Sequence, residues 1–470
     1  MRRTLAGDAP PPVNRWRCLS GNHPRLHHRP SIHPVIVVTF SYIGTYSAYT
    51  RAYTRTTAGI RATRIRRRHL MAHIRSLFFD GPLSEVENKA LKAYTMGRPS
   101  DVIWNITNRC NLLCDHCYMA ADAHSLPDQL SDEETITLIT QMGELGVPLV
   151  FLSGGEPMMR KNFWEILEKA HSYGMHITVS TNATLITREA AKRLKANGVD
   201  WIATSLYGPP HFHDKMVGVP GTHDRVIAAI KILREEGVGV ALKSAVSRDT
   251  LPFIPHIIAK AKELDAGLVY LCDLITSGRS EGEESARATA AEWKQLADSI
   301  LADLLDPAST MEYDIGAIPS VIPYLAEKLK AEGVDVSNGL ERLKLVSACP
   351  VGKGHMNINS EGGIMPCQFA QDWTVGNIRD MTLTEATTEL YKLDAQEAKG
   401  ICAPEACEYS RICRGCRTKA WHATGDAMFE DPTCLLKRLA DGEGTTPGDA
   451  HYERTPLSAA APCVAPGACG

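Results

Sequence analysis

The sequence VIWNITNRCNLLCDHC, residues 102–117, joins a short apolar run to three closely spaced cysteines. The run Val102–Thr107 has the length and character of a buried strand. Cys110, Cys114 and Cys117 follow it directly, and three thiolates can bind three irons of a 4Fe–4S cluster while the fourth iron stays open to an external ligand. A zinc knuckle completed by His116 or His124 is the alternative, although zinc sites usually have four ligands in pairs with two or four residues between cysteines.

The pairing of an apolar run with an amphipathic helical pattern repeats along the chain after this point. The expected strands are Val102–Thr107, Leu149–Leu152, His176–Ser180, Trp201–Ser205, Val238–Val246 and Leu268–Asp273. Six strand-then-helix units predict an α/β fold with a parallel sheet over residues 101–285, either open or, as we expect, curled into a partial (β/α)6 barrel of the TIM type. Loops at the carboxyl ends of such strands carry the chemistry. Residues 286–345 are expected to form a helical connector.

Both ends of the chain differ from this body. Residues 1–70 contain thirteen Arg and a single acidic residue, Asp8. Organelle transit peptides are Arg-rich and poor in acidic residues, but no amphipathic helical pattern is visible, so a start codon assigned upstream of Met71 is the favoured interpretation. Residues 71–100 form a short lead-in, and residues 439–470, rich in Gly, Thr, Pro and Ala, are expected to be disordered.

Charge and composition limit the classes of function. Outside residues 1–70 the chain has 38 Lys and Arg against 53 Asp and Glu, a net charge of -15 that disfavours nucleic acid as a partner. No run reaches the roughly 18 apolar residues that a membrane helix needs. Ten of the fourteen cysteines fall in residues 110–117 and 349–434. This clustering favours metal ligation in a reducing compartment, the cytoplasm, over the disulfides of a secreted protein.

Three more strand ends carry glycine or small polar residues. The turn SGGEP, residues 153–157, closes the second expected strand, and its two glycines and proline are typical of a tight bend. Asn182 follows the third strand, and Ser205 ends the fourth, where small polar side chains commonly act as caps. Each is ordinary by itself, but a barrel brings all of them to the same edge as the cysteine loop.

The spacing Cys-x3-Cys-x2-Cys, with His116 before the third cysteine and Tyr118 after it, resembles the signature of the radical S-adenosylmethionine (SAM) superfamily. The resemblance implies a cluster whose free iron is chelated by the amino and carboxylate groups of SAM, and one-electron reduction that yields a 5′-deoxyadenosyl radical. It also implies SAM contacts from His116, Gly154, Gly155, Glu156, Asn182 and Ser205. Many relatives have Ser-x-Asp-Gly after the fourth strand, whereas residues 205–208 of this chain read SLYG.

A second field of cysteines lies near the C-terminus, at Cys349, Cys367, Cys402, Cys407, Cys413, Cys416 and Cys434. Their order resembles the SPASM extension of radical SAM enzymes, although two spacers depart from the usual Cys-x2-Cys-x5-Cys-x3-Cys. The resemblance implies a small SPASM domain over residues 346–438 with two auxiliary 4Fe–4S clusters. Four cysteines would complete one cluster: Cys402, Cys407, Cys413 and Cys434. Three would hold the other with one iron lacking a cysteine: Cys349, Cys367 and Cys416. A purely structural role, with clusters replacing a core, stays open.

Residues 414–434 resemble the ending of SPASM enzymes of tetrapyrrole biosynthesis, including the alternative haem pathway and haem d1 synthesis. This implies hydrogen abstraction from a propionate of a haem-type precursor, then oxidative decarboxylation or side-chain loss, with ferredoxin or flavodoxin as the electron donor. Maturases of ribosomally made peptides have similar tails and are the alternative. About 30 residues separate Met71 from the first strand, which is short for their peptide-recognition domain. A non-enzymatic iron–sulfur scaffold would not need residues 154–157 beside an open-sited cluster.

Overall fold

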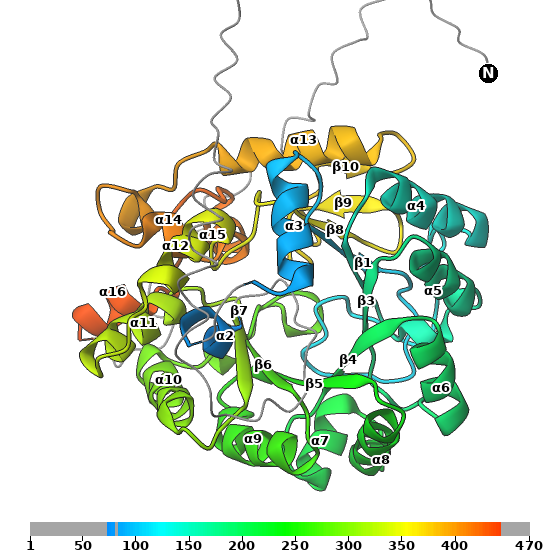
Figure 1. Ribbon diagram of the computed structural model, residues 1–470, viewed down its shortest axis with the longest axis horizontal. Helices are drawn as coiled ribbons and strands as arrows, with labels where there is room; N and C mark the ends of the chain where they lie inside the picture. Colours follow the sequence, from blue (N-terminus) through cyan, green and yellow to red (C-terminus); the bar gives the residue numbers. More distant parts are fainter. Residues whose placement is uncertain (1–72, 80–82, 443–470) are drawn as a thin grey trace, which may run out of the picture. The chain divides into compact units, whose positions relative to one another are not determined.

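The computed structural model describes residues 73–79 and 83–442. Within them a ten-stranded sheet runs in the order β10-β9-β8-β1-β2-β3-β4-β5-β6-β7, curved around a central space (Figure 1). Its strands are β1 Asp101–Asn105, β2 Leu149–Ser153, β3 His176–Ser180, β4 Val199–Ser205, β5 Gly239–Val246, β6 Leu268–Asp273, β7 Glu312–Gly316, β8 His355–Ile358, β9 Gly363–Met365 and β10 Gly376–Asn377.

The six strands expected from the sequence are present and pair in parallel in chain order, which confirms the α/β partial barrel. The sheet continues past both ends of this set. On one side β7 pairs in parallel with β6, and on the other β8 pairs in parallel with β1. The antiparallel strands β9 and β10 then follow β8. Residues 286–345, expected as a helical connector, contain the three helices Ala290–Leu305, Val321–Ala331 and Ser337–Val346, and strand β7 lies among them.

Helices cover the outside of the sheet (Figure 1). They are α2 Ile74–Phe78, α3 Glu85–Thr95, α4 Asp132–Leu145, α5 Phe163–Ser172, α6 Arg188–Ala196, α7 Pro210–Val217, α8 Thr222–Glu235, α9 Ile254–Glu263, α10 Ala290–Leu305, α11 Val321–Ala331, α12 Ser337–Val346, α13 Leu383–Asp394, α14 Ser410–Cys413, α15 Arg417–Thr424 and α16 Leu435–Ala440.

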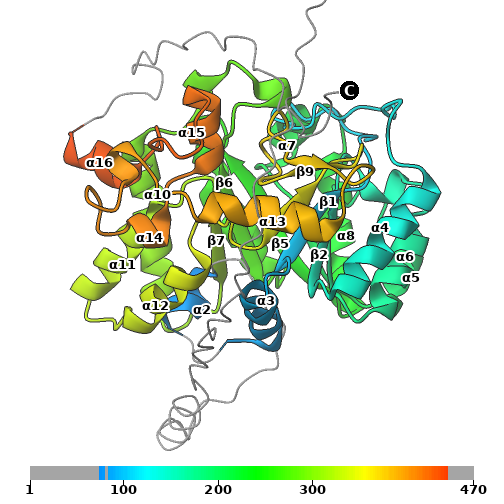
Figure 2. The ribbon, with the colours of Figure 1, turned by 90° about the horizontal axis from the view of Figure 1, so that it is seen from above.

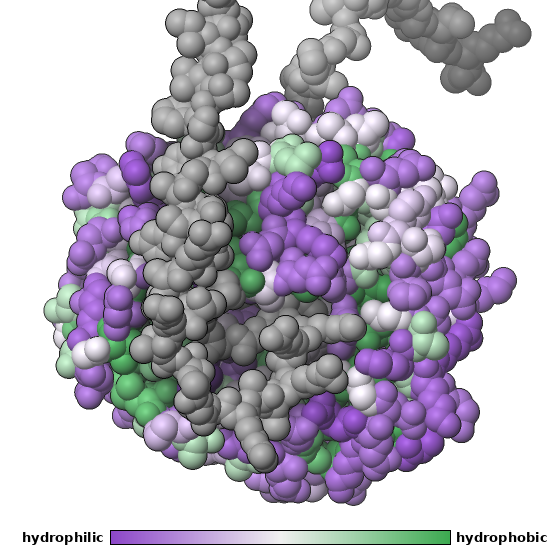
Figure 3. All heavy atoms as spheres, in the orientation of Figure 1, coloured by the Kyte–Doolittle hydropathy of each residue, from purple (hydrophilic) through white to green (hydrophobic). Residues whose placement is uncertain are grey.

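Helix α4 illustrates why these segments fold as they do. Its N-cap Ser131 accepts from the backbone N–H of Glu134, whose carboxylate accepts from the Ser131 N–H in turn, so two otherwise unsatisfied donors are paired. Leu138, Ile139 and Met142 share one face and are fully buried. On the face of the molecule shown in Figure 3, hydrophilic side chains dominate the outer helices. One-sided burial therefore fixes how each helix sits on the sheet.

The C-terminal cysteine-rich segment packs against the barrel (Figure 2). Arg379 binds the Glu134 carboxylate of α4 at 2.6 Å, and the Leu435 N–H donates to Ser320 Oγ at the start of α11. A fully buried ion pair joins Lys419 of α15 to Asp273 at the end of β6. These contacts fix the segment against the edge of the barrel where the strands end.

Within residues 73–79 and 83–442, no helix is both long enough and apolar enough to cross a membrane. The Arg-rich leader of residues 1–70 and most of the tail of residues 439–470 lie outside the described residues, so the expectations for them stay predictions.

Candidate active site

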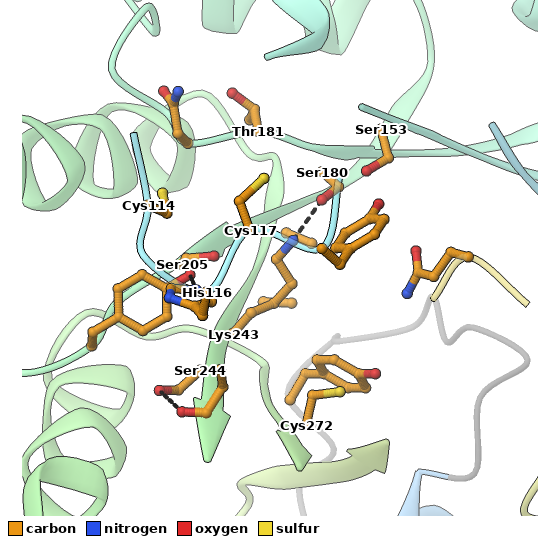
Figure 4. A pocket seen from close by; sticks show the side chains of 18 of the residues that line it. Cys114, His116, Cys117, Ser153, Ser180, Thr181, Ser205, Lys243, Ser244 and Cys272 are labelled. Atoms are coloured by element: carbon orange, nitrogen blue, oxygen red, sulfur yellow. Dashed lines mark hydrogen bonds between the residues drawn. The ribbon is translucent and has the colours of Figure 1, made fainter. Parts of the chain in front are cut away.

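The three cysteines of the loop after β1 line a cavity of about 280 Å³ inside the barrel. Residues from the ends of β2, β3 and β4 line it too, among them Gly154, Asn182 and Ser205. Figure 4 shows several of the polar side chains in this space. The structure thus brings the cysteine loop and three of the sequence-predicted strand ends to a single cavity.

The thiols of this loop are shielded from water and lie close to one another. Burial, followed by the charge of Cys117, raises the pKa of Cys114 to about 12. Burial is also the main cause that raises the pKa of Cys110 to about 11. The Leu112 N–H and the Asn182 amide point at Cys110 Sγ, at 3.4 and 3.8 Å. Such thiols ionise when a metal replaces their protons, and these donors stabilise the resulting thiolate.

The glycine turn lets the loop after β2 lie directly on the cysteine loop. The N–H of Gly155 donates to Thr107 O, and that of Glu156 donates to Arg109 O, both at 2.8 Å. A Cβ atom on Gly154 would sit 2.3 Å from Thr107 O, and one on Gly155 would sit 2.4 Å from Arg109 O. Only glycine permits this approach. The turn therefore holds the backbone that leads into the cysteines.

The side chain of Glu156 lies behind the cavity wall in this structure. It is fully buried and is not among the residues that line the cavity. Its carboxylate accepts from the Thr181 hydroxyl, the Asn182 N–H and the Met158 N–H at 2.8 to 3.0 Å. In this structure Glu156 connects the loops after β2 and β3, and the backbone of Gly154 and Gly155 is what faces the cavity.

The tyrosine that stands where many relatives have aspartate is bound to the cysteine loop. Tyr207 is buried, and its hydroxyl lies 2.8 Å from His116 Nε2. The two rings also meet edge to face, with centroids 4.5 Å apart. Burial, with a smaller contribution from Arg279, lowers the pKa of His116 to about 4, so its ring is neutral near pH 7. Tyr207 thereby fixes the orientation of His116, which the sequence analysis includes among the SAM contacts.

Arg279, in the loop after β6, clamps the cysteine loop and is not among the site residues predicted from the sequence. Arg279 donates from Nε to Cys114 O at 2.7 Å and from a terminal nitrogen to Ala121 O at 2.8 Å, and its N–H bonds to Cys117 O. The preceding Gly278 has φ +62, and a Cβ there would meet Cys117 O at 2.3 Å. Only a signal that this loop folds back over a much earlier part of the chain could have identified it, and no local pattern provides one.

Replacing Gly278 by alanine should displace the cysteine loop. The new methyl group would press on two backbone oxygens, those of Cys117 and Tyr118, which cannot rotate away as a side chain would. Because small misplacements of reacting groups are costly, we expect the rate of SAM cleavage to fall by about a hundredfold. The measurement is 5′-deoxyadenosine formed per minute by the anaerobic enzyme.

Gly174 offers a matched control, since it has φ +68 but nothing within 4 Å of the place that a Cβ atom would occupy. Gly174→Ala should cost only the strain of a left-handed alanine, roughly 1 kcal/mol, and leave SAM cleavage intact. Equal losses in the two variants would contradict the proposed clamp.

One half-buried lysine also lines the cavity and is not among the site residues predicted from the sequence. Lys243 of β5 donates from Nζ to Ser180 Oγ at 2.5 Å (Figure 4). Burial lowers its pKa to about 8. The alternating pattern of a strand does not by itself mark this residue as facing the barrel interior, because in a parallel barrel both faces of a strand are covered.

The C-terminal cysteines separate into two groups by their electrostatic neighbours. Burial raises the pKa of Cys434 to about 12, with further contributions from Cys402 and Cys407, and Cys413 is affected by Cys434 and Cys402. Cys416 instead has Cys349 and Cys367 as its sulfur neighbours. This grouping is compatible with the two sets that the SPASM resemblance implies, and their assignment to two clusters stays a prediction. Among the described residues, no three His, Cys, Asp or Glu side chains are spaced to hold a single metal ion.

The second group lies beside the active-site cavity. Cys349, Cys367 and Cys416 line another cavity of about 140 Å³. The two cavities have several wall residues in common, namely Ile103, Phe151, Tyr270, Ile275, Asp314, Gln368 and Phe369. Only one layer of side chains therefore separates the cysteines of the second group from the space inside the barrel.

Comparisons with known proteins agree with this geometry. A model of the radical SAM superfamily matches residues 104–256, and a model of the SPASM iron-sulfur cluster-binding domain matches residues 349–417. The chain belongs to the radical SAM superfamily and carries a SPASM domain. It is an iron–sulfur enzyme whose cofactors are a 4Fe–4S cluster with SAM in the barrel and auxiliary iron–sulfur clusters in the SPASM domain. The zinc-knuckle alternative is thereby excluded.

Among its relatives is the AdoMet-dependent heme synthase of Methanosarcina barkeri, 30% identical over 72% of this chain and 97% of that protein. The PqqA peptide cyclase of Gluconobacter oxydans is 26% identical over 73% of this chain and 92% of that protein. Among solved structures, Streptococcus suis SuiB bound to S-adenosylmethionine matches with a TM-score of 0.57 at 18% identity, covering 73% of this chain and 79% of that one. The last likeness concerns the fold alone.

Proposed function

We propose that this enzyme modifies a side chain of a haem-type tetrapyrrole precursor, most simply by oxidative decarboxylation of a propionate. The observation that carries the proposal is the match to an AdoMet-dependent heme synthase over nearly the whole length of that relative. The alignment therefore includes both the barrel and the SPASM segment. When bound, the reduced cluster and SAM supply a carbon radical that removes a hydrogen atom from the substrate.

In this proposal the chain's own residues hold and shield the reacting groups. Cys110, Cys114 and Cys117 hold the SAM-binding cluster, and their position on the cavity wall supports the assignment. The backbone of Gly154 and Gly155 and the side chains of His116, Asn182 and Ser205 contact SAM. Glu156 acts indirectly by fixing the Asn182 loop, since its oxygens are already bonded within the protein.

The SPASM cysteines serve the same reaction from the neighbouring cavity. Oxidative decarboxylation removes a hydrogen atom, carbon dioxide and one electron from the side chain, so an electron acceptor close to the substrate is needed. Cys349, Cys367 and Cys416 would hold one auxiliary cluster, separated from the barrel by a single layer of side chains. A second set would hold the other auxiliary cluster: Cys402, Cys407, Cys413 and Cys434.

A reducing setting is part of the proposal. Within the described residues none of the eleven cysteines is in a disulfide, which favours the cytoplasm over an oxidising compartment. A small electron carrier such as ferredoxin or flavodoxin would reduce the cluster.

The second candidate is modification of a ribosomally made peptide. The PqqA peptide cyclase relative favours it, because it also aligns over most of its own length. The substrate would then be a polypeptide that enters the barrel from outside, and the same cysteines and SAM contacts would serve.

Turnover distinguishes the two. The anaerobically reconstituted enzyme, given SAM, dithionite and iron-coproporphyrin, should release carbon dioxide from the porphyrin and form 5′-deoxyadenosine in proportion. Mass spectrometry of the porphyrin measures the loss. An unchanged porphyrin in an enzyme that still cleaves SAM would reject the tetrapyrrole proposal and leave the peptide as the better candidate.

A further inference from the structure

The cavity wall carries a half-buried ammonium group with no carboxylate near enough to pair with it among the described residues. Lys243 sits on β5, in register with Ser205 of β4 and Tyr270 of β6. The hydroxyl of Ser180 is its hydrogen-bond acceptor. A buried cation without an anion is costly. A carboxylate that entered the cavity would reduce this cost.

The Arg and Asp side chains that line this cavity do not pair with Lys243. Arg279, the second Lys or Arg side chain among its described lining residues, is engaged with backbone carbonyls of the cysteine loop. Asp273 is paired with Lys419. Burial, followed by the charge of Glu312, raises the pKa of Asp314 to about 7, so that carboxyl carries only part of a negative charge at neutral pH.

Glu156 does not neutralise the lysine either. Its charge acts on Lys243, but it lies behind the wall and its oxygens are engaged by Thr181, Asn182 and Met158. Lys243 therefore lies on the cavity wall with a hydroxyl next to it and no carboxylate paired with it among the described residues. A carboxylate could accept from both groups, since the ammonium has three donors and the hydroxyl can turn to donate.

We propose that Lys243 is a substrate-binding residue that pairs with a carboxylate of the substrate inside the barrel, assisted by Ser180. This assignment rests on the proposed function, because a haem-type precursor carries propionate carboxylates and chemistry on one of its side chains requires that side chain to enter this cavity. The cavity of about 280 Å³ would also hold the cluster and SAM, so only a side chain of the macrocycle would enter it. Lys243 would thus select for an acidic side chain and orient it.

SAM is the other source of a carboxylate in this enzyme, so the test separates the two ligands. Three variants of the reconstituted holoenzyme are compared with the unaltered enzyme: Lys243→Met, Lys243→Arg and Lys231→Met. Methionine keeps the length of the lysine and removes its charge, arginine keeps the charge, and Lys231 is an exposed lysine on α8. Binding of iron-coproporphyrin is followed by its visible absorption, and binding of SAM is followed by calorimetry.

We expect Lys243→Met to bind iron-coproporphyrin about ten- to a hundredfold more weakly, the usual effect of losing a buried charged hydrogen bond. Its affinity for SAM should stay within about twofold, because SAM is held by other groups. Lys243→Arg should recover part of the lost affinity, and Lys231→Met should behave like the unaltered enzyme. A tetramethyl ester of the same porphyrin should bind the unaltered enzyme weakly and Lys243→Met no more weakly than that.

Two results would overturn the inference while the proposed function stands. Unchanged porphyrin affinity in Lys243→Met would remove Lys243 from substrate binding. A loss confined to SAM affinity would assign the lysine to SAM instead. If the unaltered enzyme neither binds nor converts iron-coproporphyrin, the proposed function fails first and this inference fails with it.

Discussion

Cys114→Ala should abolish formation of 5′-deoxyadenosine and lower the iron content from about twelve to about eight per chain. Cys114 lies on the wall of the barrel cavity, whereas the two groups of SPASM cysteines lie outside this loop. Removing one of its three protein ligands should prevent binding of the open-sited cluster and leave the two auxiliary clusters in place. Iron analysis after anaerobic reconstitution, together with chromatography of the SAM products, measures both effects.

Cys272 provides the control for this experiment. It is a buried thiol on β6 that belongs to none of the three cysteine groups, so Cys272→Ala should retain all the iron. Continued SAM cleavage by Cys114→Ala would reject the assignment of the catalytic cluster. A content near four irons in the unaltered enzyme would reject both auxiliary clusters.

Lys419→Met should destabilise the fold by about 3–5 kcal/mol, the usual cost of leaving one charge of a buried pair without its partner. Both side chains of the Lys419–Asp273 pair are 2% exposed. Asp273 also accepts a hydrogen bond from the indole of Trp293 at 2.6 Å. The fluorescence of this buried tryptophan during anaerobic urea unfolding should therefore show a lower midpoint.

A surface pair is the control. Lys437 of α16 pairs with Asp441, which caps the end of that helix, and both side chains are partly exposed, so Lys437→Met should change the free energy of unfolding by less than about 1 kcal/mol. The double variant Lys419→Met with Asp273→Asn removes both charges and keeps an acceptor for Trp293. It should recover most of the lost stability. If it is no more stable than Lys419→Met, the destabilisation comes from lost packing around α15.

The strands visible in the sequence and the strands that were missed differ in one physical respect. Strands β1 to β6 are apolar over most of their length, so local pattern predicts them. Strand β7 places Glu312 and Asp314 at buried positions, and β8 does the same with His355. Glu312 is satisfied by Ser76, and His355 is bonded to Asp101. These partners lie far away in the sequence, so the local pattern of residues in β7 and β8 indicates an exposed polar segment and not a buried strand.

The site divides in a similar way. The cysteines and the glycine turn have fixed spacing in the sequence, which identifies them without a structure. Arg279 and Lys243 have no such spacing, because the importance of each depends on a contact made across the barrel. Glu156 was identified as a site residue, yet the direction of its side chain needed the structure. The spacing of a motif predicts which residues gather, but not which of their atoms face the ligand.

The pairing of β8 with β1 has a consequence for how such enzymes can be recombined. Strand β1 is buried along its entire length, and β8 supplies one of its two hydrogen-bonded neighbours. A chain cut before β8 would leave the N–H and C=O groups along one side of the apolar strand β1 unpaired. Such an open edge can pair with strands of other chains and cause aggregation. The cysteine-rich segment therefore cannot be removed as an independent domain, because it completes the sheet that carries the active site.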